Sequence, residues 1–281
     1  MAADLHLHTN FSDGTYSPEE LAEHAARVRL HTIALTDHDT VEGCPRAAVA
    51  CRNLGLEFIP GAELTAEIDE TEIHLLGYYL DADHPGLLRE TAKFQTVRQN
   101  RISEMVQRLN QLGIPLEAEA VFALAKCRSP GRPHVGRALV RGGFCSSVNE
   151  AFERFLKKDR PAWVPKFKMP AFEGIELIHN AGGLAILAHP GLNQVDPAIP
   201  LLAEAGLDGL ECFHTKHAPS TADHYLRLSE SLQLLVTGGS DCHGLAKAQP
   251  LIGSLRLDDA YVERLRAAKR RLTPHRAAST A

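Results

Sequence analysis

Short apolar runs alternate with amphipathic segments along most of the chain. The runs at 32–36, 184–188 and 234–237 have the length and composition of buried strands. The segments between them carry apolar residues at helical spacing, and Ser17-Pro18-Glu19-Glu20 is a capping box that predicts a helix start. Further strands are expected at the chain start and at 56–60, 64–68, 73–80, 208–212 and 252–257. About seven buried strands, mostly separated by helices, favour an α/β fold with a parallel βα barrel.

One stretch interrupts this alternation. Residues 85–112 have the pattern of one long helix, shorter helical pieces follow, and no strand signal appears before residue 182. We therefore predict a helical insertion at 88–168 in a barrel formed by residues 1–87 and 169–281, whose last residues, 273–281, form a frayed tail.

The charge of the chain is divided unevenly between these parts. Residues 89–168 hold 16 Lys and Arg against 7 Asp and Glu, whereas the remainder holds 14 against 28. A basic insertion beside an acidic body suggests metal ions that neutralise the body and an anionic ligand bound between the two.

The composition is that of a soluble globular protein, with 44% hydrophobic and 23% charged residues. No apolar run approaches the roughly 20 residues that span a bilayer, and no basic and apolar leader precedes the first strand. We expect a cytoplasmic protein without a membrane partner. The six cysteines form no C-x-x-C pair, so we expect reduced thiols in the core.

Potential metal ligands follow nearly every strand-like run. His6 and His8 are two apart and would share one face of the opening strand. The other runs lead to His38, Glu63, His189, and Asp241 with His243, whereas His74 lies near the start of its run. Because the carboxyl ends of barrel strands form one rim, these residues should converge. Imidazoles and carboxylates without thiolates suit Zn, Mn or Fe, and their number predicts two or three ions suited to phosphoester hydrolysis.

These motifs resemble a known family. His6-x-His8, Thr36-Asp37-His38, Gly61-x-Glu63, His74, His189-Pro190 and Gly239-Ser240-Asp241-x-His243 are similar to the PHP (polymerase and histidinol phosphatase) family, over residues 4–80 and 184–257. The resemblance implies a distorted (β/α)7 TIM-like barrel and a metal-dependent phosphoesterase. Asp37 and Asp39 both have the chemistry to orient a ligand, although for Asp39 we expect a helix N-cap instead.

The resemblance also implies a distribution of ligands among ions. His6, His8, Glu63 and Asp241 would hold one ion, and Glu63 would bridge it to a second held by His74 and His189. Asp13, His38 and His243 occupy a third position. Since some members carry His at the position of Asp13, we expect two ions, or three if this site is filled, with Mn favoured over Zn, Fe or Co. The catalytic residues would be Asp13, His38, Asp241 and His243, and with two ions the third group would hold or protonate the phosphate.

The insertion adds candidate phosphate ligands. Arg98 and Arg101 are neighbours on one helix face, although a solvated face is an alternative, and Gly131-Arg132-Pro133-His134 starts a helix whose amides suit an anion. This segment resembles a PHP branch that dephosphorylates nucleoside 3′,5′-bisphosphates and trims short 5′-phosphorylated RNA. The expected substrate-binding residues are Asp13, His38, Arg98, Gln99, Asn100, Arg101, Ile102, Arg132, His134 and His243.

The expected activity is removal of the 3′-phosphate from a nucleoside 3′,5′-bisphosphate by a monomeric protein, with 5′ to 3′ trimming of short RNA as a further activity. The alternatives are a histidinol-phosphate phosphatase, a non-catalytic PHP module, and a metal-dependent amide or lactone hydrolase, which often needs a lysine that no strand end here supplies. The net charge of −5 argues against long RNA or duplex DNA as a partner.

Overall fold

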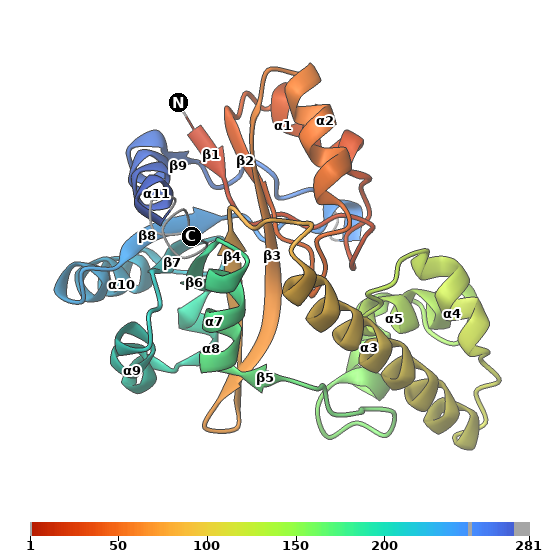
Figure 1. Cartoon of the computed structure of the whole chain (residues 1–281). Coiled ribbons are helices and arrows are strands. Elements are labelled where there is room, and N and C mark those ends of the chain that lie inside the picture. The colour runs from red at the N-terminus through yellow and green to blue at the C-terminus, as the bar shows by residue number, and fades with distance from the viewer. Residues whose placement is uncertain (1, 247–248, 273–281) are drawn as a thin grey trace.

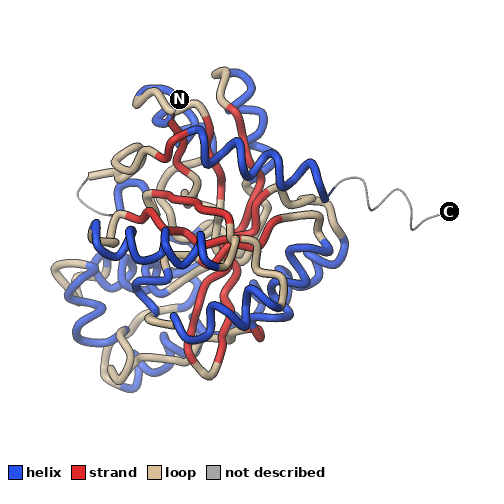
Figure 2. The backbone as a smooth tube through the Cα atoms, turned by 90° about the vertical axis from the view of Figure 1, so that its left-hand side faces the viewer, coloured by secondary structure: helices blue, strands red, loops and turns tan. Residues whose placement is uncertain are grey.

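The computed structural model describes residues 2–246 and 249–272, so the predicted tail at 273–281 lies outside the described residues. Seven strands form most of a barrel-like sheet in the order β8-β7-β6-β4-β3-β2-β1, surrounded by helices (Figures 1 and 2). They are β1 (Ala2–Asp4), β2 (Thr32–Leu35), β3 (Glu57–Ile68), β4 (Thr71–Tyr78), β6 (Leu184–Leu187), β7 (Gly209–His214) and β8 (Leu235–Gly239). The short β9 (Leu257–Asp258) pairs with β1, and β5 (Met169–Pro170) pairs with β3. The predicted distorted barrel is confirmed.

The distortion comes from β4, which runs antiparallel to both of its neighbours, β3 and β6. The other neighbouring pairs among the seven strands are parallel. The barrel closes beyond the end of β1, where Leu5 N donates to Gly238 O (3.2 Å) and Leu7 bridges in parallel to Cys242. A Cβ atom on Gly239 would lie 2.3 Å from Cβ of His6, so only glycine permits this approach.

Successive side chains along the strands point to opposite faces of the sheet and pack in two different apolar clusters. Leu5, Ala34 and Ile59 belong to a cluster that also includes Val262 and Leu265 of α11 (Asp259–Leu272). The residues of the opposite strand faces pack in a larger cluster with the surrounding helices. These helices are α1 (Pro18–Arg27), α2 (Cys44–Asn53), α7 (Ala171–Asn180), α8 (Pro190–Asn193), α9 (Ile199–Glu204) and α10 (Pro219–Ser231).

The capping box predicted for α1 is present, since Ser17 and Glu20 exchange side-chain to backbone hydrogen bonds. All six cysteines are free, and five of them are buried. Within the described residues, no helix is both long and apolar enough to cross a membrane.

The long helix α3 (Pro85–Gln111) joins the barrel to a second core. Its first half contributes Leu87 and Phe94 to the barrel cluster, and its second half contributes Met105 and Leu109 to a separate cluster within the insertion. Figure 1 shows α3 leading away from the barrel towards α4 and α5. The insertion helices are α4 (Ala118–Ala125), α5 (Arg132–Arg141) and α6 (Val148–Ala151), which continues into a π-helical turn at Phe152–Leu156. They match the helical pieces expected from the sequence.

Three local predictions are wrong. The strands expected at 56–60 and 64–68 are one continuous strand, β3, because its first part pairs with β2 and its second part pairs with β4. The strand expected at 252–257 is reduced to Leu257–Asp258. His6 and His8 follow β1 in an extension held by the bridge from Leu7 and do not lie within the strand.

Candidate metal centre

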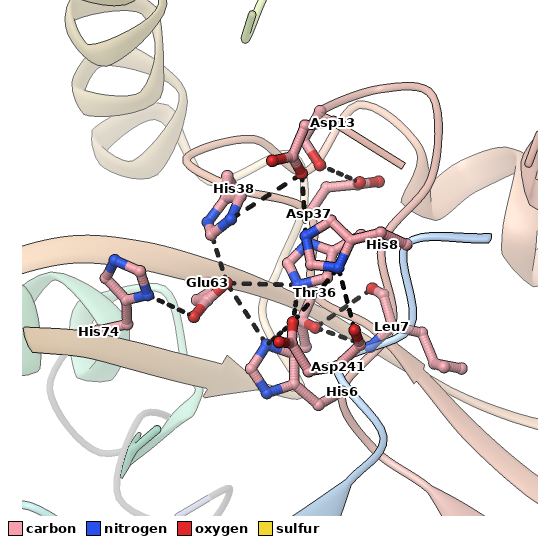
Figure 3. A network of polar contacts seen from close by, with 12 residues as sticks. His6, Leu7, His8, Asp13, Thr36, Asp37, His38, Glu63, His74 and Asp241 are labelled. Atoms are coloured by element: carbon pink, nitrogen blue, oxygen red, sulfur yellow. Dashed lines mark hydrogen bonds and ion pairs between the residues drawn. The ribbon is translucent and has the colours of Figure 1, made fainter. Parts of the chain in front are cut away.

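The extension after β1 places two imidazoles inside the rim of the barrel. Leu7 N donates to Thr36 Oγ1 (3.1 Å), and His8 N donates to Cys242 O (3.0 Å), so the extension is held between the ends of β2 and β8. His6 and His8 are fully buried and point towards Glu63 and Asp241 (Figure 3).

Glu63 lies at the centre of the site. Its Oε1 is 2.6 Å from His74 Nδ1 and 3.1 Å from His189 Nε2. Its Oε2 faces the other way, 2.9 Å from His38 Nδ1 and 3.4 Å from Nε2 of both His6 and His8. Each carboxylate oxygen therefore faces its own set of imidazoles, as in a carboxylate that bridges two ions. His74, predicted as an exception, reaches the site because antiparallel β4 runs back alongside β3.

Asp241 and His243 complete the opposite side of the site. Asp241 Oδ1 lies 3.3 Å from His8 Nε2, and His243 Nε2 lies 3.2 Å from Asp13 Oδ1. The loop that carries Asp13 is held by Asp37, which accepts hydrogen bonds from Thr9 N (2.7 Å) and Ser12 Oγ (2.6 Å). Asp37 thus orients the loop of a candidate ligand.

Many polar atoms of the site are buried and, although other candidate ligands lie close to them, make no contact with hydrogen-bond geometry among the described residues: His6 Nε2, His8 Nδ1 and Nε2, Asp13 Oδ1, His38 Nδ1, Glu63 Oε2 and His189 Nδ1. Unpaired buried polar atoms are costly unless a further group satisfies them. The ligand atoms fall into three groups, each within 4.8 Å: His8, Asp13, His38 and His243; His6, His8 and Asp241; and His38, Glu63 and His74. The donors fit divalent metal ions.

The buried carboxylates and imidazoles of the site shift one another's pKa values. Burial alone would raise the pKa of Glu63, but His38, His74 and His6 outweigh it and hold this pKa well below its usual range. Burial lowers the pKa of His8 and that of His189. Against the effect of burial, Glu211 and Glu63 raise the pKa of His6, and Glu63 raises that of His74. Metal ions bind ionised carboxylates and neutral imidazoles, so an ion that binds His6 and His74 would displace their protons.

Two glutamates that the sequence did not single out orient the imidazoles. His6 Nδ1 donates to Glu211 Oε1 (3.0 Å), and His74 Nε2 lies 3.2 Å from Glu72 Oε1. Carboxylates in this position set the ring orientation and increase the basicity of a metal-binding histidine. The sequence could have indicated Glu211, because it is an acidic residue inside an otherwise apolar strand. His214 is also buried here, with Nε2 3.6 Å from Asp241 Oδ2.

The insertion contacts the loops that carry candidate ligands. Ser129 Oγ donates to His38 O (2.7 Å), and Arg137 Nη2 donates to Asp13 O (2.7 Å). Between the insertion and the metal ligands lies a cavity of about 180 Å³, which Asp13, His38 and His74 border. The basic residues that line it are Arg98, Arg101, Arg132 and Lys166. The sequence interpretation missed Lys166, whose Nζ lies 3.3 Å from both Glu72 Oε1 and His74 Nε2.

The other expected substrate ligands lie elsewhere. Ile102 is buried in the core of the insertion, and Asn100 is exposed. Gln99 donates to Arg128 O, and neither it nor Asn100 lines the cavity. His134 is buried at the start of α5, where its Nδ1 accepts from Gly131 N, and burial lowers its pKa to about 4.

Asp39 does not cap a helix, contrary to the prediction. Its carboxylate is fully buried and accepts hydrogen bonds from Thr65 N (2.7 Å) and Arg98 Nε (2.7 Å). The prediction was wrong because α2 starts only at Cys44, and the intervening backbone turns Asp39 towards β3 and α3.

Imidazoles and carboxylates line the barrel rim, and a cavity with basic residues lies next to them. These features define a metal-dependent phosphoesterase. Comparisons with known proteins agree. Residues 4–95 match the PHP domain. The chain is 33% identical over 248 residues to the 5′-3′ exoribonuclease Rnm of Escherichia coli, covering 85% of this chain and 84% of the relative. It is 28% identical to the 3′,5′-nucleoside bisphosphate phosphatase of Chromobacterium violaceum, covering 85% and 86% of the two chains.

A crystal structure of a metal-dependent phosphoesterase from Bifidobacterium adolescentis superposes with a TM-score of 0.88 at 33% identity, covering 94% of this chain and 95% of the other. The chain belongs to the PHP family, and it is a hydrolase of phosphate esters.

Proposed function

We propose that this enzyme removes the 3′-phosphate from nucleoside 3′,5′-bisphosphates, such as 3′-phosphoadenosine 5′-phosphate, and also trims short 5′-phosphorylated RNA in the 5′ to 3′ direction. The relatives named for a bisphosphate phosphatase and for an exoribonuclease support both parts. The two reactions share one chemical step. In each, water attacks the phosphorus on O3′ of a nucleoside that carries a 5′-phosphate, the P–O3′ bond breaks, and O3′ takes up a proton.

One observation carries the proposal, namely the basic lining of the cavity beside the metal ligands. Arg98, Arg101 and Arg132 are largely buried there, together with Lys166. A nucleoside bisphosphate has two phosphates, so one can lie at the metal ligands while the basic residues bind the other. Guanidinium groups suit this role because they form paired hydrogen bonds to phosphate oxygens. We propose that residues 88–168 act as a substrate-capping unit.

We propose two divalent ions for this enzyme, with Mn favoured over Zn, Fe or Co. His6, His8, Glu63 and Asp241 would hold one ion, and Glu63, His74 and His189 would hold the other. Divalent ions there would neutralise charge on the phosphoryl oxygens and activate water near neutral pH.

Asp13, His38 and His243 would face the substrate phosphate and hold a third ion only when metal is in excess. His243, 3.2 Å from Asp13, is suited to move a proton near the phosphate. Asp241 is suited to orient the attacking water. A monomer acting in the cytoplasm, without duplex DNA as a substrate, is also part of the proposal.

Histidinol phosphate is the alternative substrate. It carries a cationic amine, which the cavity disfavours because its four basic residues outnumber its two carboxylates, Asp13 and Glu72. The test is to assay protein loaded with Mn, Zn, Fe or Co on 3′-phosphoadenosine 5′-phosphate and on histidinol phosphate side by side. We expect inorganic phosphate and adenosine 5′-monophosphate from the first substrate and little turnover of the second. No phosphate release from the bisphosphate with any of these metals would refute the proposal.

A further inference from the structure

A second basic cavity, here called the groove, is lined in part by the loop that carries Asp13. Its volume is about 340 Å³. Asn10, Gly14 and Thr15 of this loop form one wall, and the C-terminal halves of α4 and α5 form the other. Asp13 itself borders the first cavity, so residues of the same loop line both basic cavities.

The charged side chains that line the groove are all positive. Lys126, Arg137 and Arg141 line it, and no Asp or Glu is among the described residues that do so. Arg137 connects it to the site, because its guanidinium donates to Asp13 O (2.7 Å). Lys126 and Arg141 are exposed, which leaves their charges available to a ligand.

The side chain of Lys126 starts at the end of α4. Lys126 ends α4 in the left-handed conformation, with φ 51° and ψ 23°. Glycine is the usual residue at such a helix end, because a side chain there is unfavourable. A lysine at this position places a charge on the groove at a conformational cost.

Resting on the proposed function, we propose that this groove binds the phosphates of the RNA that lies 3′ of the bond being hydrolysed. A nucleoside bisphosphate has nothing beyond its 3′-phosphate, whereas in RNA the remaining chain is attached to that same phosphorus. The largely buried first cavity suits a terminal 5′-phosphate, and the exposed cations of the groove suit a continuing chain. Hydrolysis releases a nucleoside 5′-monophosphate and leaves the phosphate on the shortened RNA, so the groove would hold the product for the next cycle.

The test compares two substrates of the metal-loaded enzyme, 3′-phosphoadenosine 5′-phosphate and a 5′-phosphorylated adenylate pentanucleotide. In the double variant Lys126→Ala/Arg141→Ala, we expect KM for the pentanucleotide to rise about tenfold more than KM for the bisphosphate, since only the RNA loses phosphate contacts. The dependence of log KM on log salt concentration should also become shallower for the pentanucleotide alone. The control is Lys158→Ala/Arg160→Ala, which removes the same charge from other exposed positions of the insertion and should leave both KM values unchanged.

Equal changes of KM for the two substrates, or the same RNA defect in the control variant, would overturn the groove as an RNA site. A wild-type enzyme that hydrolyses the bisphosphate but not the pentanucleotide would overturn the groove while leaving the bisphosphatase proposal intact. Absence of bisphosphate hydrolysis would instead count against the proposed function. Fluorescence anisotropy of the pentanucleotide labelled at its 3′ end measures binding directly, with a chelator present to prevent turnover. The groove variant should bind this RNA with a correspondingly lower affinity than the wild type.

Discussion

Asp39 and Arg98 form a buried ion pair across the junction between the barrel and the insertion, with Arg98 Nη2 2.6 Å from Asp39 Oδ2. The carboxylate follows β2 next to His38, and the guanidinium comes from the middle of α3. Arg98 also borders the basic cavity, so one side chain links the candidate metal loop, the insertion and the expected phosphate site.

Removing one partner of this pair should destabilise the protein strongly. In Arg98→Met, the Asp39 charge stays buried without its cation, and we expect the free energy of unfolding to fall by about 3–5 kcal/mol. The double variant Arg98→Met/Asp39→Asn should recover a large part of this loss because no uncompensated charge remains. Urea unfolding of the metal-free single and double variants measures these changes in the free energy of unfolding. If the loss in the double variant equals the sum of the losses in the two single variants, the pair is not coupled.

Glu211 should tune metal affinity without binding metal. Glu211→Gln weakens the hydrogen bond that orients His6 through its Nδ1. We expect the dissociation constant of the bound metal to rise about 10–100-fold. Titration of chelator-treated protein with Mn should show this, and activity should return at higher Mn concentrations. Glu173→Gln, at an exposed position of α7, is the matched control and should titrate like the wild type. Loss of activity that no metal concentration restores would contradict an orienting role.

Asp13 should affect only the weakest metal site. After loading with Mn and desalting, we expect two ions per chain in both the wild type and Asp13→Asn, because the expected ligands of these ions are intact. In excess Mn, calorimetry should detect a third binding event in the wild type that is at least about tenfold weaker in the variant. Asp83→Asn, exposed and remote in sequence, serves as the control. A variant that retains fewer than two ions would place Asp13 in a tight site.

Lys166 should contribute to recognition of the second phosphate. Its ammonium group lines the basic cavity, and a charge-assisted contact contributes about 1.5–3 kcal/mol. We expect Lys166→Met to raise KM for 3′-phosphoadenosine 5′-phosphate about 10–100-fold, with a much smaller effect on 4-nitrophenyl phosphate, which has a single phosphate.

Lys168→Met is the matched control for this prediction. Lys168 lies two residues further along the same segment and pairs with Glu67, outside the cavity. Equal losses on both substrates in Lys166→Met would instead assign Lys166 to positioning His74.

The sequence by itself determined the barrel, the helical insertion and the residues that converge at the rim. These are recoverable because strand length, helical spacing and the position of polar residues at strand ends are local properties of the chain. His6, Glu63 and Asp241 are therefore identifiable without knowledge of which side chains they face.

Only the tertiary structure decided the partners. Glu211 and Lys166 reach the site through contacts between distant segments, and Asp39 pairs with Arg98 across 59 positions instead of capping the nearby helix. Such pairings depend on how elements pack, because a buried charge takes the partner that folding places within reach, and local propensity carries no information about that partner. The tertiary structure also decided that β3 is continuous, because β3 pairs first with β2 and then with β4. This continuity places Glu63 between two sets of imidazoles.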